Sequence, residues 1–245
     1  MTITSQHNQR LKEIRKLRMR RRERERAGRF VAEGEDLLSA ADAAGWTAVE
    51  RYVAAGSGLE GVEVDPKLLN QAAGLASGTR TLAVYAERWA PNAQGPLCVY
   101  LHGVHDPGNV GAVLRSAEAF GASCVAIGPG TADPFSPKAV RASMGAVFAV
   151  PVTRVDDVSA LPGVRIALDA AGDVELSQIP LHIAVENAEE QEVTVLVGSE
   201  RDGLPEHVIA QADHTAQIPI HTHSLNAAMA ATIALYELGH RMRPA

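Results

Sequence analysis

From residue 97 onward, short apolar runs alternate with segments of helical pattern, and this alternation constrains the fold more than any other feature. We expect strands at residues 97–101, 124–127, 147–152, 164–167, 193–197 and 217–220. Helices are expected at 109–120 and 137–143, after Pro205, and from 225 to about 242. Such alternation is typical of a largely parallel sheet covered by helices on both faces. The predicted fold class is therefore α/β with a mostly parallel sheet.

The first 90 residues predict a smaller α/β unit of their own. Helices are expected at 5–27, 36–44 and 66–75, a short strand with a turn at 30–34, and further strands at 49–54, 62–64 and 82–85. Residues 91–96 have the Pro- and Gly-containing composition of a linker. A chain of 245 residues is long enough for two cores. We therefore assign 1–90 and 97–245 to separate domains.

Charge is distributed unevenly along the chain, although the formal net charge is only −6. Residues 10–29 hold eleven basic and three acidic residues, a local charge of +8, and the rest of the chain carries −14. A concentrated cationic segment on an acidic body predicts a polyanionic partner that binds at one end of the molecule. A solvated helix with Arg/Glu pairs is the alternative, but the consecutive Arg20, Arg21 and Arg22 exceed what such pairing needs.

The two cysteines, Cys98 and Cys124, both lie in apolar runs that are expected to be strands. Buried thiols in a reducing compartment are favoured over a disulfide. No run of 18 apolar residues is present, and the N-terminal segment is polar and basic rather than apolar. We therefore expect a cytoplasmic protein without a membrane partner.

Three polar, glycine-bearing loops each follow an expected strand and lead into an expected helix. They span residues 106–115, 198–205 and 218–226. The carboxyl ends of parallel strands share one edge of the sheet, where α/β proteins place their ligands. Asn109 and Ser224 suit the N-caps of the helices that follow. The loops together supply amides, a carboxylate, a hydroxyl, a guanidinium and accessible backbone for one site.

Several other kinds of site are disfavoured by the same residues. The chain has no Gly-x-x-x-x-Gly-Lys-Ser/Thr phosphate loop, and the turn after Leu101 lacks the Gly-x-Gly-x-x-Gly dinucleotide pattern. It has no cysteine cluster for structural zinc. His221 and His223 are spaced so that they could share a metal ion, but such a pair is more often loop polarity, so no metal is predicted.

In chain order, the loops resemble the three signature motifs of the SpoU/TrmH-type RNA ribose 2′-O-methyltransferases of the SPOUT class. The first is similar at 106–115 (DPGNVGAVLR), the second at 198–204 (GSERDGL) and the third at 218–226 (IPIHTHSLN). The run 141–146 (RASMGA) is similar to a further stretch common in the family. The resemblance covers residues 97–240. The basic start followed by FVAEG at 30–34 is similar to the L30e-like substrate-binding domain that many members carry.

This resemblance implies features that spacing alone does not show. The C-terminal part of the chain would pass through a loop to form a trefoil knot, against the usual rule for folds. The protein would be a homodimer whose active site takes residues from both subunits. The implied S-adenosylmethionine site comprises Gly198, Ser199, Gly203, Ile218, Ile220, Ser224 and Leu225. The implied polar active-site residues are Asn109, Arg115, Glu200, Ser224 and Asn226.

The implied reaction transfers a methyl group from S-adenosylmethionine to a ribose 2′-hydroxyl, which requires RNA rather than DNA. The extra N-terminal domain favours ribosomal over transfer RNA. Arg20, Arg21, Arg22 and Arg115 are expected to contact that RNA. A guanidinium is a poor base, so for Arg115 we favour contact with a phosphate over proton abstraction.

The third loop departs from the family pattern, because the segment between Ile220 and Ser224 is shorter than in many relatives. That departure supports one alternative function, a non-catalytic RNA-binding or ribosome-associated protein that keeps the fold.

Overall fold

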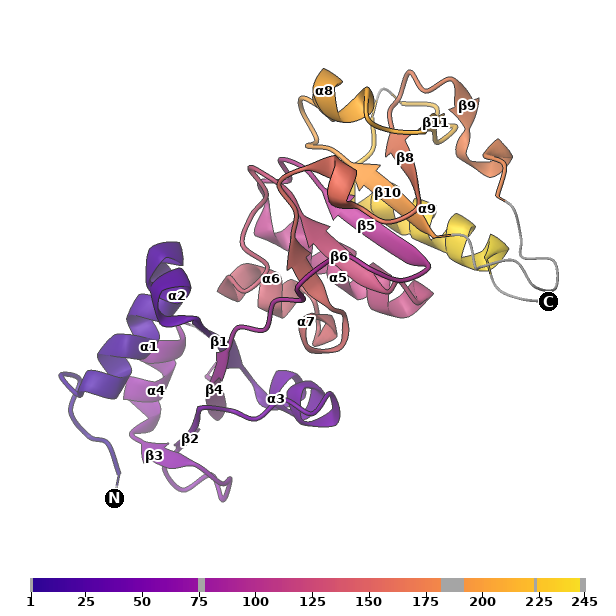
Figure 1. The fold of residues 1–245 in the computed structure, drawn as a ribbon. Coiled ribbons are helices and arrows are strands. Elements are labelled where there is room, and N and C mark those ends of the chain that lie inside the picture. Colours follow the sequence, from indigo (N-terminus) through magenta and orange to yellow (C-terminus); the bar gives the residue numbers. More distant parts are fainter. Residues whose placement is uncertain (1, 75–77, 182–191, 223, 243–245) are drawn as a thin grey trace. The chain divides into compact units, whose positions relative to one another are not determined.

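The computed structural model describes residues 2–74, 78–181, 192–222 and 224–242. Its contacts divide the chain into two compact units (Figure 1). The first consists of Met1–Arg88 together with Asp133–Ala149, and the second of Trp89–Ala132 together with Val150–Ala245. The segment 133–149, which the sequence analysis placed in the second domain, thus belongs by its contacts to the first unit.

The first unit is built on a four-stranded sheet in the order β1-β4-β2-β3. Its strands are β1 (Arg29–Glu33), β2 (Glu50–Ala54), β3 (Val62–Val64) and β4 (Thr81–Ala86). β4 pairs antiparallel with both β1 and β2, whereas β2 and β3 are parallel. The N-terminal helices are α1 (Gln9–Met19), α2 (Arg21–Ala27), α3 (Glu35–Ala43) and α4 (Pro66–Ala73). Leu11, Ile14 and Leu17, the predicted apolar stripe of α1, are fully buried in the core of this unit.

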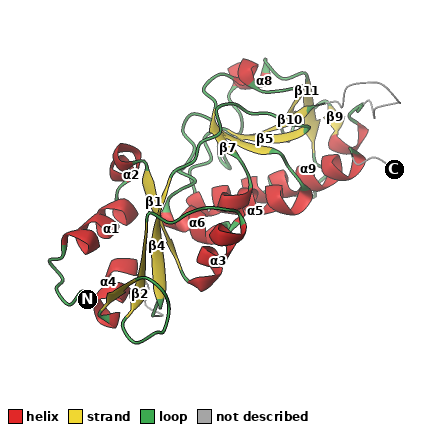
Figure 2. Ribbon diagram, turned by 60° about the horizontal axis from the view of Figure 1, so that its bottom comes forward, coloured by secondary structure: helices red, strands yellow, loops and turns green. Residues whose placement is uncertain are grey.

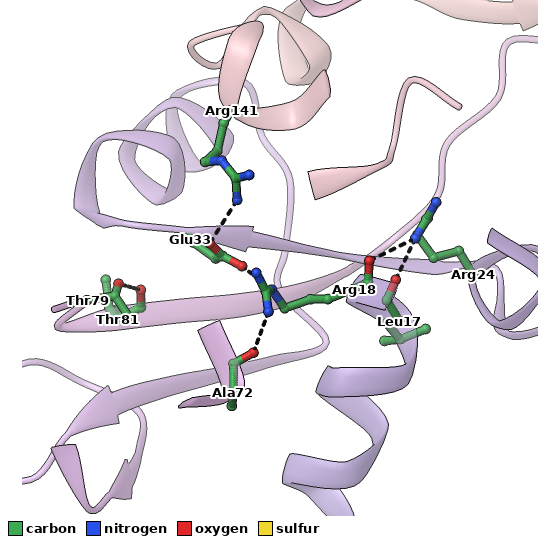
Figure 3. Close-up of polar contacts among 8 residues, drawn as sticks. All are labelled: Leu17, Arg18, Arg24, Glu33, Ala72, Thr79, Thr81 and Arg141. Atoms are coloured by element: carbon green, nitrogen blue, oxygen red, sulfur yellow. Dashed lines mark hydrogen bonds and ion pairs between the residues drawn. The ribbon is translucent and has the colours of Figure 1, made fainter. Parts of the chain in front are cut away.

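The single helix expected at 5–27 is wrong, because two helices meet at an extended residue. Asn8 caps α1, and Arg20 adopts φ −130° and ψ 116° before α2 begins. The buried Arg24 explains the break (Figure 3). Its guanidinium donates to the carbonyl of Leu17 at 2.7 Å, as Figure 3 shows. It also pairs with Asp133 at 2.7 Å. A buried cation needs such partners, and the turn between the helices brings the carbonyl at the end of α1 within its reach.

Aromatic packing and ion pairs hold residues 133–149 in the first unit. Phe135 and Phe148 pack against Phe30 with ring centroids 4.8 and 5.9 Å apart. Arg141 pairs with the buried carboxylate of Glu33 at 3.3 Å, and the same carboxylate accepts from Arg18 (Figure 3). This segment forms α6 (Pro137–Ala142) and α7 (Ala146–Ala149), so the strand expected at 147–152 is wrong over most of its length. Burial of the aromatic side chains outweighs the β propensity of that apolar run.

The second unit contains a seven-stranded sheet in the order β7-β6-β5-β10-β8-β11-β9, and every strand pair in it is parallel. The predicted α/β class with a mostly parallel sheet is confirmed. The strands are β5 (Leu97–Leu101), β6 (Cys124–Ile127), β7 (Val152–Arg154), β8 (Val164–Leu168), β9 (Val174–Glu175), β10 (Val193–Val197) and β11 (His214–Gln217).

The last strand and the helices of the second unit lie close to their expected positions. β11 ends at Gln217, before the expected strand at 217–220 could form, because Pro219 has no N–H for a ladder. The helices are α5 (Pro107–Phe120), α8 (Glu206–Ile209) and α9 (Ala227–Arg241). α5 and α9 pack against each other (Figure 2), and Ser116 and Thr232 share a hydrogen bond of 2.6 Å between them. The trefoil knot stays a prediction.

Cys98 and Cys124 are directly paired residues of β5 and β6, and both are buried free thiols. The hydrogen bond between them, together with burial, raises the pKa of the Cys98 thiol. No helix among the described residues is long and apolar enough to cross a membrane.

Candidate active site

The three polar loops leave the carboxyl ends of three parallel strands of one sheet, β5, β10 and β11. β5 and β10 are adjacent, with Leu101 opposite Val197, and β8 lies between β10 and β11. The loops therefore meet at one edge of the sheet, as parallel topology requires.

Side-chain hydrogen bonds join all three loops at this edge. Asn226 Nδ2 donates to Asn109 Oδ1 at 3.1 Å, and Asn109 Nδ2 in turn donates to the carboxylate of Glu200. Each of these residues comes from a different loop. Three of the five polar residues predicted for the active site thus form one continuous chain of hydrogen bonds.

The helix caps differ from those expected, and the difference explains this network. Asp106, not Asn109, caps α5 by accepting from Gly108 N–H at 2.7 Å. Asn226, not Ser224, caps α9 by accepting from Ala228 N–H at 2.9 Å. Because Asp106 satisfies the helix start, the Asn109 amide in the first turn is left to bond Glu200 and Asn226.

A cavity of about 350 Å³ opens beside this network. All seven residues predicted to bind the cofactor line it: Gly198, Ser199, Gly203, Ile218, Ile220, Ser224 and Leu225. Glu200 lines it as well, so the cavity and the hydrogen-bond network share that residue. The branched side chains supply apolar walls, and the loop glycines leave backbone groups accessible.

The loop after β10 is held in a tight, closed turn. Ser199 N–H donates to Gly203 O at 3.2 Å, and Gly203 N–H donates back to Ser199 O at 3.1 Å. Ser199 Oγ also accepts from Asp202 N–H at 3.0 Å. A Cβ on Gly198 would lie 2.2 Å from the carbonyl carbon of Gly203, so only glycine fits there. The turn therefore presents its residues to the cavity in a fixed arrangement.

The sequence analysis missed one wall of the cavity, which comes from the end of β8. Leu168, Asp169 and Ala170 line it there. A signal was present, because the strand expected at 164–167 is followed, after Leu168, by an Asp-Ala-Ala-Gly turn at the same edge of the sheet. Further lining residues outside the prediction are Val197, Arg201, Asp202, Ala216, Ala227 and Ala230.

Arg115 does not line the cavity. It lies on α5 in the second turn after Asn109, and its side chain is exposed. Across the described residues it has no ion-pair or hydrogen-bond partner. An exposed guanidinium without a partner is available to an external anion.

The arginines predicted to bind RNA lie at the junction of α1 and α2 in the first unit. Arg20, Arg21 and Arg22 are exposed, and Arg21 pairs with Glu25 at 2.8 Å. Six of the eleven cations in 10–29 form ion pairs: Arg10, Arg18, Arg21, Arg24, Arg26 and Arg29. The pairs of Arg18 and Arg24 are largely buried, so the alternative of a paired, solvated segment describes only the other four cations and leaves out Arg20 and Arg22.

The histidines near the loops have separate surroundings. His221 is exposed, and His223 lies outside the described residues. Within the described ranges, no group of three or more His, Cys, Asp or Glu is arranged to hold a metal ion. His102, at the end of β5, contacts Tyr100 Oη through Nδ1 at 3.0 Å. Burial, and then the nearby His207, lower the pKa of His102, so its neutral form is favoured.

Comparison with known families covers both units. Residues 96–236 match the SpoU rRNA Methylase family, and residues 8–88 match the MRM3-like substrate binding domain. The chain therefore belongs to the SpoU rRNA methylase family, and an MRM3-like substrate-binding domain precedes its methylase domain. The family predicted from the three loops is confirmed.

Two curated relatives are named as ribosomal RNA methyltransferases. The chain is 33% identical over 145 residues to the 23S rRNA (uridine(2479)-2'-O)-methyltransferase of Streptomyces viridochromogenes, which covers 54% of this chain and 48% of that protein. It is also 33% identical over 144 residues to the 23S rRNA (guanosine(2553)-2'-O)-methyltransferase RlmP of Bacillus subtilis (strain 168). That match covers 55% of this chain and 54% of RlmP. The chain thus spans about half the length of the curated relatives it matches.

A solved structure is similar over the whole chain. The AdoMet-bound rRNA methyltransferase from Sinorhizobium meliloti superimposes with a TM-score of 0.87 at 30% identity. The match covers 100% of this chain and 99% of that one. Both units therefore have counterparts in a single known protein.

Proposed function

We propose that this protein transfers a methyl group from S-adenosylmethionine to a ribose 2′-hydroxyl of ribosomal RNA. One observation carries the proposal: the seven expected cofactor residues line one cavity, and the Asn226–Asn109–Glu200 hydrogen-bond network shares Glu200 with it. The names of the relatives and of the AdoMet-bound structure support the same reaction.

The residues of the cavity fit S-adenosylmethionine by size and chemistry. A volume of about 350 Å³ falls in the usual range for small-molecule sites. Ile218, Ile220 and Leu225 offer apolar contact to a purine, and the closed turn 199–203 offers polar backbone and hydroxyl groups. When bound, the cofactor supplies a methyl group already activated by its positively charged sulfur.

The contribution of the protein is then mainly orientation, because the methyl donor needs no further activation. Aligning the two reactants gives effective molarities of about 10⁵–10⁸ M in favourable cases. Asn109, which accepts a hydrogen bond from Asn226, donates to the carboxylate of Glu200 and holds it at the edge of the cavity. Arg115 is assigned to an RNA phosphate next to the reacting ribose, because its guanidinium is exposed and unpaired among the described residues.

The RNA would be bound by the exposed arginines at the α1–α2 junction as well as by Arg115. The match of 8–88 to a substrate-binding domain supports this role for the first unit. The acidic remainder of the chain opposes indiscriminate coating of nucleic acid. The two free cysteines agree with a cytoplasmic location, where ribosomal RNA is modified.

A homodimer belongs to the same proposal. Met229, Ile233 and Tyr236 follow one another at helical spacing on α9, and each is an exposed large apolar side chain. An exposed apolar stripe of this kind marks an interaction surface. A second copy of the chain is the occupant that the family resemblance implies.

The test is methyl transfer from radiolabelled S-adenosylmethionine to purified ribosomal and transfer RNA, with nuclease mapping of the modified ribose. Label in a ribose 2′-O-methyl group of ribosomal RNA is the expected result. Binding of RNA without cofactor affinity or label would overturn the proposal in favour of the non-catalytic alternative.

A further inference from the structure

Asp169 is a cavity residue that lies outside the three family motifs. It follows β8 directly and lines the cavity. Among the described residues it has no ion-pair partner. Its Oδ1 accepts from Ala171 N–H at 2.7 Å, which leaves Oδ2 without a partner in the described part of the chain. The side chain is half-buried, so this oxygen is held near a ligand surface and is less screened than an exposed carboxylate.

The backbone around Asp169 is fixed against the neighbouring strand. Asp169 N–H donates to Ala216 O at 3.0 Å, and Gly172 N–H donates to Asp169 O at 3.1 Å. A Cβ on Gly172 would lie 2.6 Å from the carbonyl carbon of Ala216, so the turn packs tightly on β11. The carboxylate is therefore preorganised by the fold, and a ligand does not have to order it.

Acidic side chains outnumber basic ones around the cavity. The charged residues that line it are Asp169, Glu200, Asp202 and Arg201. Glu200 is already engaged by Asn109, and Asp202 is exposed. Asp169 is thus the carboxylate that combines partial burial, a fixed turn and a free oxygen.

We propose that Asp169 makes the cavity discriminate the charged methyl donor from its spent product. This inference rests on the proposed function. In the transfer, the sulfur–methyl bond breaks as the oxygen–methyl bond forms, and the electron pair returns to sulfur. The 2′-hydroxyl proton leaves to a base. The sulfur therefore loses its positive charge, and S-adenosylhomocysteine carries one positive charge fewer than S-adenosylmethionine.

A fixed negative charge at the cavity wall favours the more positive of two ligands that otherwise have almost the same shape. For a partly screened pair several ångströms apart, Coulomb attraction amounts to roughly a fivefold difference in affinity. Asp169 thereby promotes release of the product, which the apolar contacts of the cavity hold as well as they hold the donor.

Calorimetry on the full-length protein tests this directly, with S-adenosylmethionine and S-adenosylhomocysteine as the two probes. Asp169→Asn keeps an acceptor oxygen for Ala171 N–H and replaces the charged carboxylate by a neutral amide of nearly the same shape. We expect it to raise the Kd of S-adenosylmethionine about fivefold and to leave that of S-adenosylhomocysteine within about twofold. Asp156→Asn, the same change at an exposed residue outside the cavity, should alter neither Kd.

A second measurement needs no variant. Raising the salt concentration should weaken binding of the charged donor to the wild-type protein more than binding of the product, because screening acts on the charge-dependent part. Equal losses for both ligands, in the variant or with salt, would overturn the role of Asp169 while cofactor binding stands. A wild-type protein that binds neither ligand would overturn the proposed function itself.

Discussion

The side-chain amide of Asn226 donates to that of Asn109 at 3.1 Å, which joins the first turns of α9 and α5 across 117 positions of sequence. The Asn226 oxygen meanwhile accepts from Ala228 N–H and Met229 N–H as the cap of α9. One side chain therefore both starts a helix and positions the polar network of the site.

These two roles of Asn226 are separable by substitution. Asn226→Ala removes the cap and the donor, so we expect a loss of about 1 kcal/mol in the free energy of unfolding and slower methyl transfer. Asn226→Asp keeps a capping oxygen, removes the donor to Asn109 and adds a negative charge, which the N-terminus of α9 favours. Urea denaturation should place it near the wild type, while transfer assays should group it with the alanine variant. Wild-type transfer by Asn226→Asp would show that the contact with Asn109 has no catalytic part.

Removing the guanidinium of Arg115 should slow methyl transfer, because the contact with the RNA is lost in the transition state, and should not change the affinity for the cofactor. We expect Arg115→Ala to lower the transfer rate by about 100-fold, as the loss of a charge-assisted contact does at other sites, with S-adenosylmethionine affinity within about twofold. Arg115→Lys keeps the charge but lacks the forked geometry of the guanidinium, so its transfer rate should lie between those of the wild type and Arg115→Ala. Full turnover by the alanine variant would exclude Arg115 from the mechanism.

The exposed arginines of the α1–α2 junction should control the salt dependence of RNA binding. Replacing Arg20, Arg21 and Arg22 with alanine should lower the slope of log affinity against log salt by about two, because each phosphate contact contributes roughly 0.7–0.9. A triple variant of the paired Arg10, Arg26 and Arg29 carries the same charge change and serves as the control. Equal slopes for the two variants would mean that net charge, and not this surface, sets RNA affinity.

Arg24 should act on stability rather than on RNA binding. Its side chain is 5% exposed and pairs with Asp133, itself 8% exposed. Arg24→Ala leaves a buried carboxylate without its partner, a change that costs about 3–5 kcal/mol. Arg22→Ala, at an exposed position, should cost less than about 0.5 kcal/mol in the same urea titration. Joint replacement by Arg24→Met and Asp133→Leu should recover much of the loss, and a double variant as unstable as the single one would contradict the burial argument.

The apolar stripe of α9 should be needed for self-association. Tyr236 is 57% exposed, and a charge introduced there opposes burial in an interface. Light scattering at micromolar concentration should report a dimer for the wild type and a monomer for Tyr236→Asp. Met19→Asp, at an apolar residue that is 80% exposed in the first unit, should remain dimeric. A monomeric wild type would remove the homodimer from the proposal.

Much of the second unit could be predicted from local pattern. The strands 97–101, 124–127 and 193–197 have the expected bounds, because continuous apolar runs bounded by glycine and polar residues leave little choice in a parallel sheet. The convergence of the three loops followed from topology alone, since parallel strands end at a common edge. The helix caps could not be predicted from local sequence, because two nearby residues with capping side chains were present at each helix start, Asp106 and Asn109 at one and Ser224 and Asn226 at the other.

The sequence by itself determined the periodicity, the loop chemistry and therefore the family. Only the tertiary structure decided that Asp106 and Asn226 cap their helices, that residues 133–149 pack with the first unit, and that Asp169 joins the cavity. The physical reason is that neighbouring residues fix backbone preference within a few positions. Arg24 and Asp133 are 109 positions apart and become partners only when packing buries both of them. Each buried charge is then stabilised by its ion pair with the other.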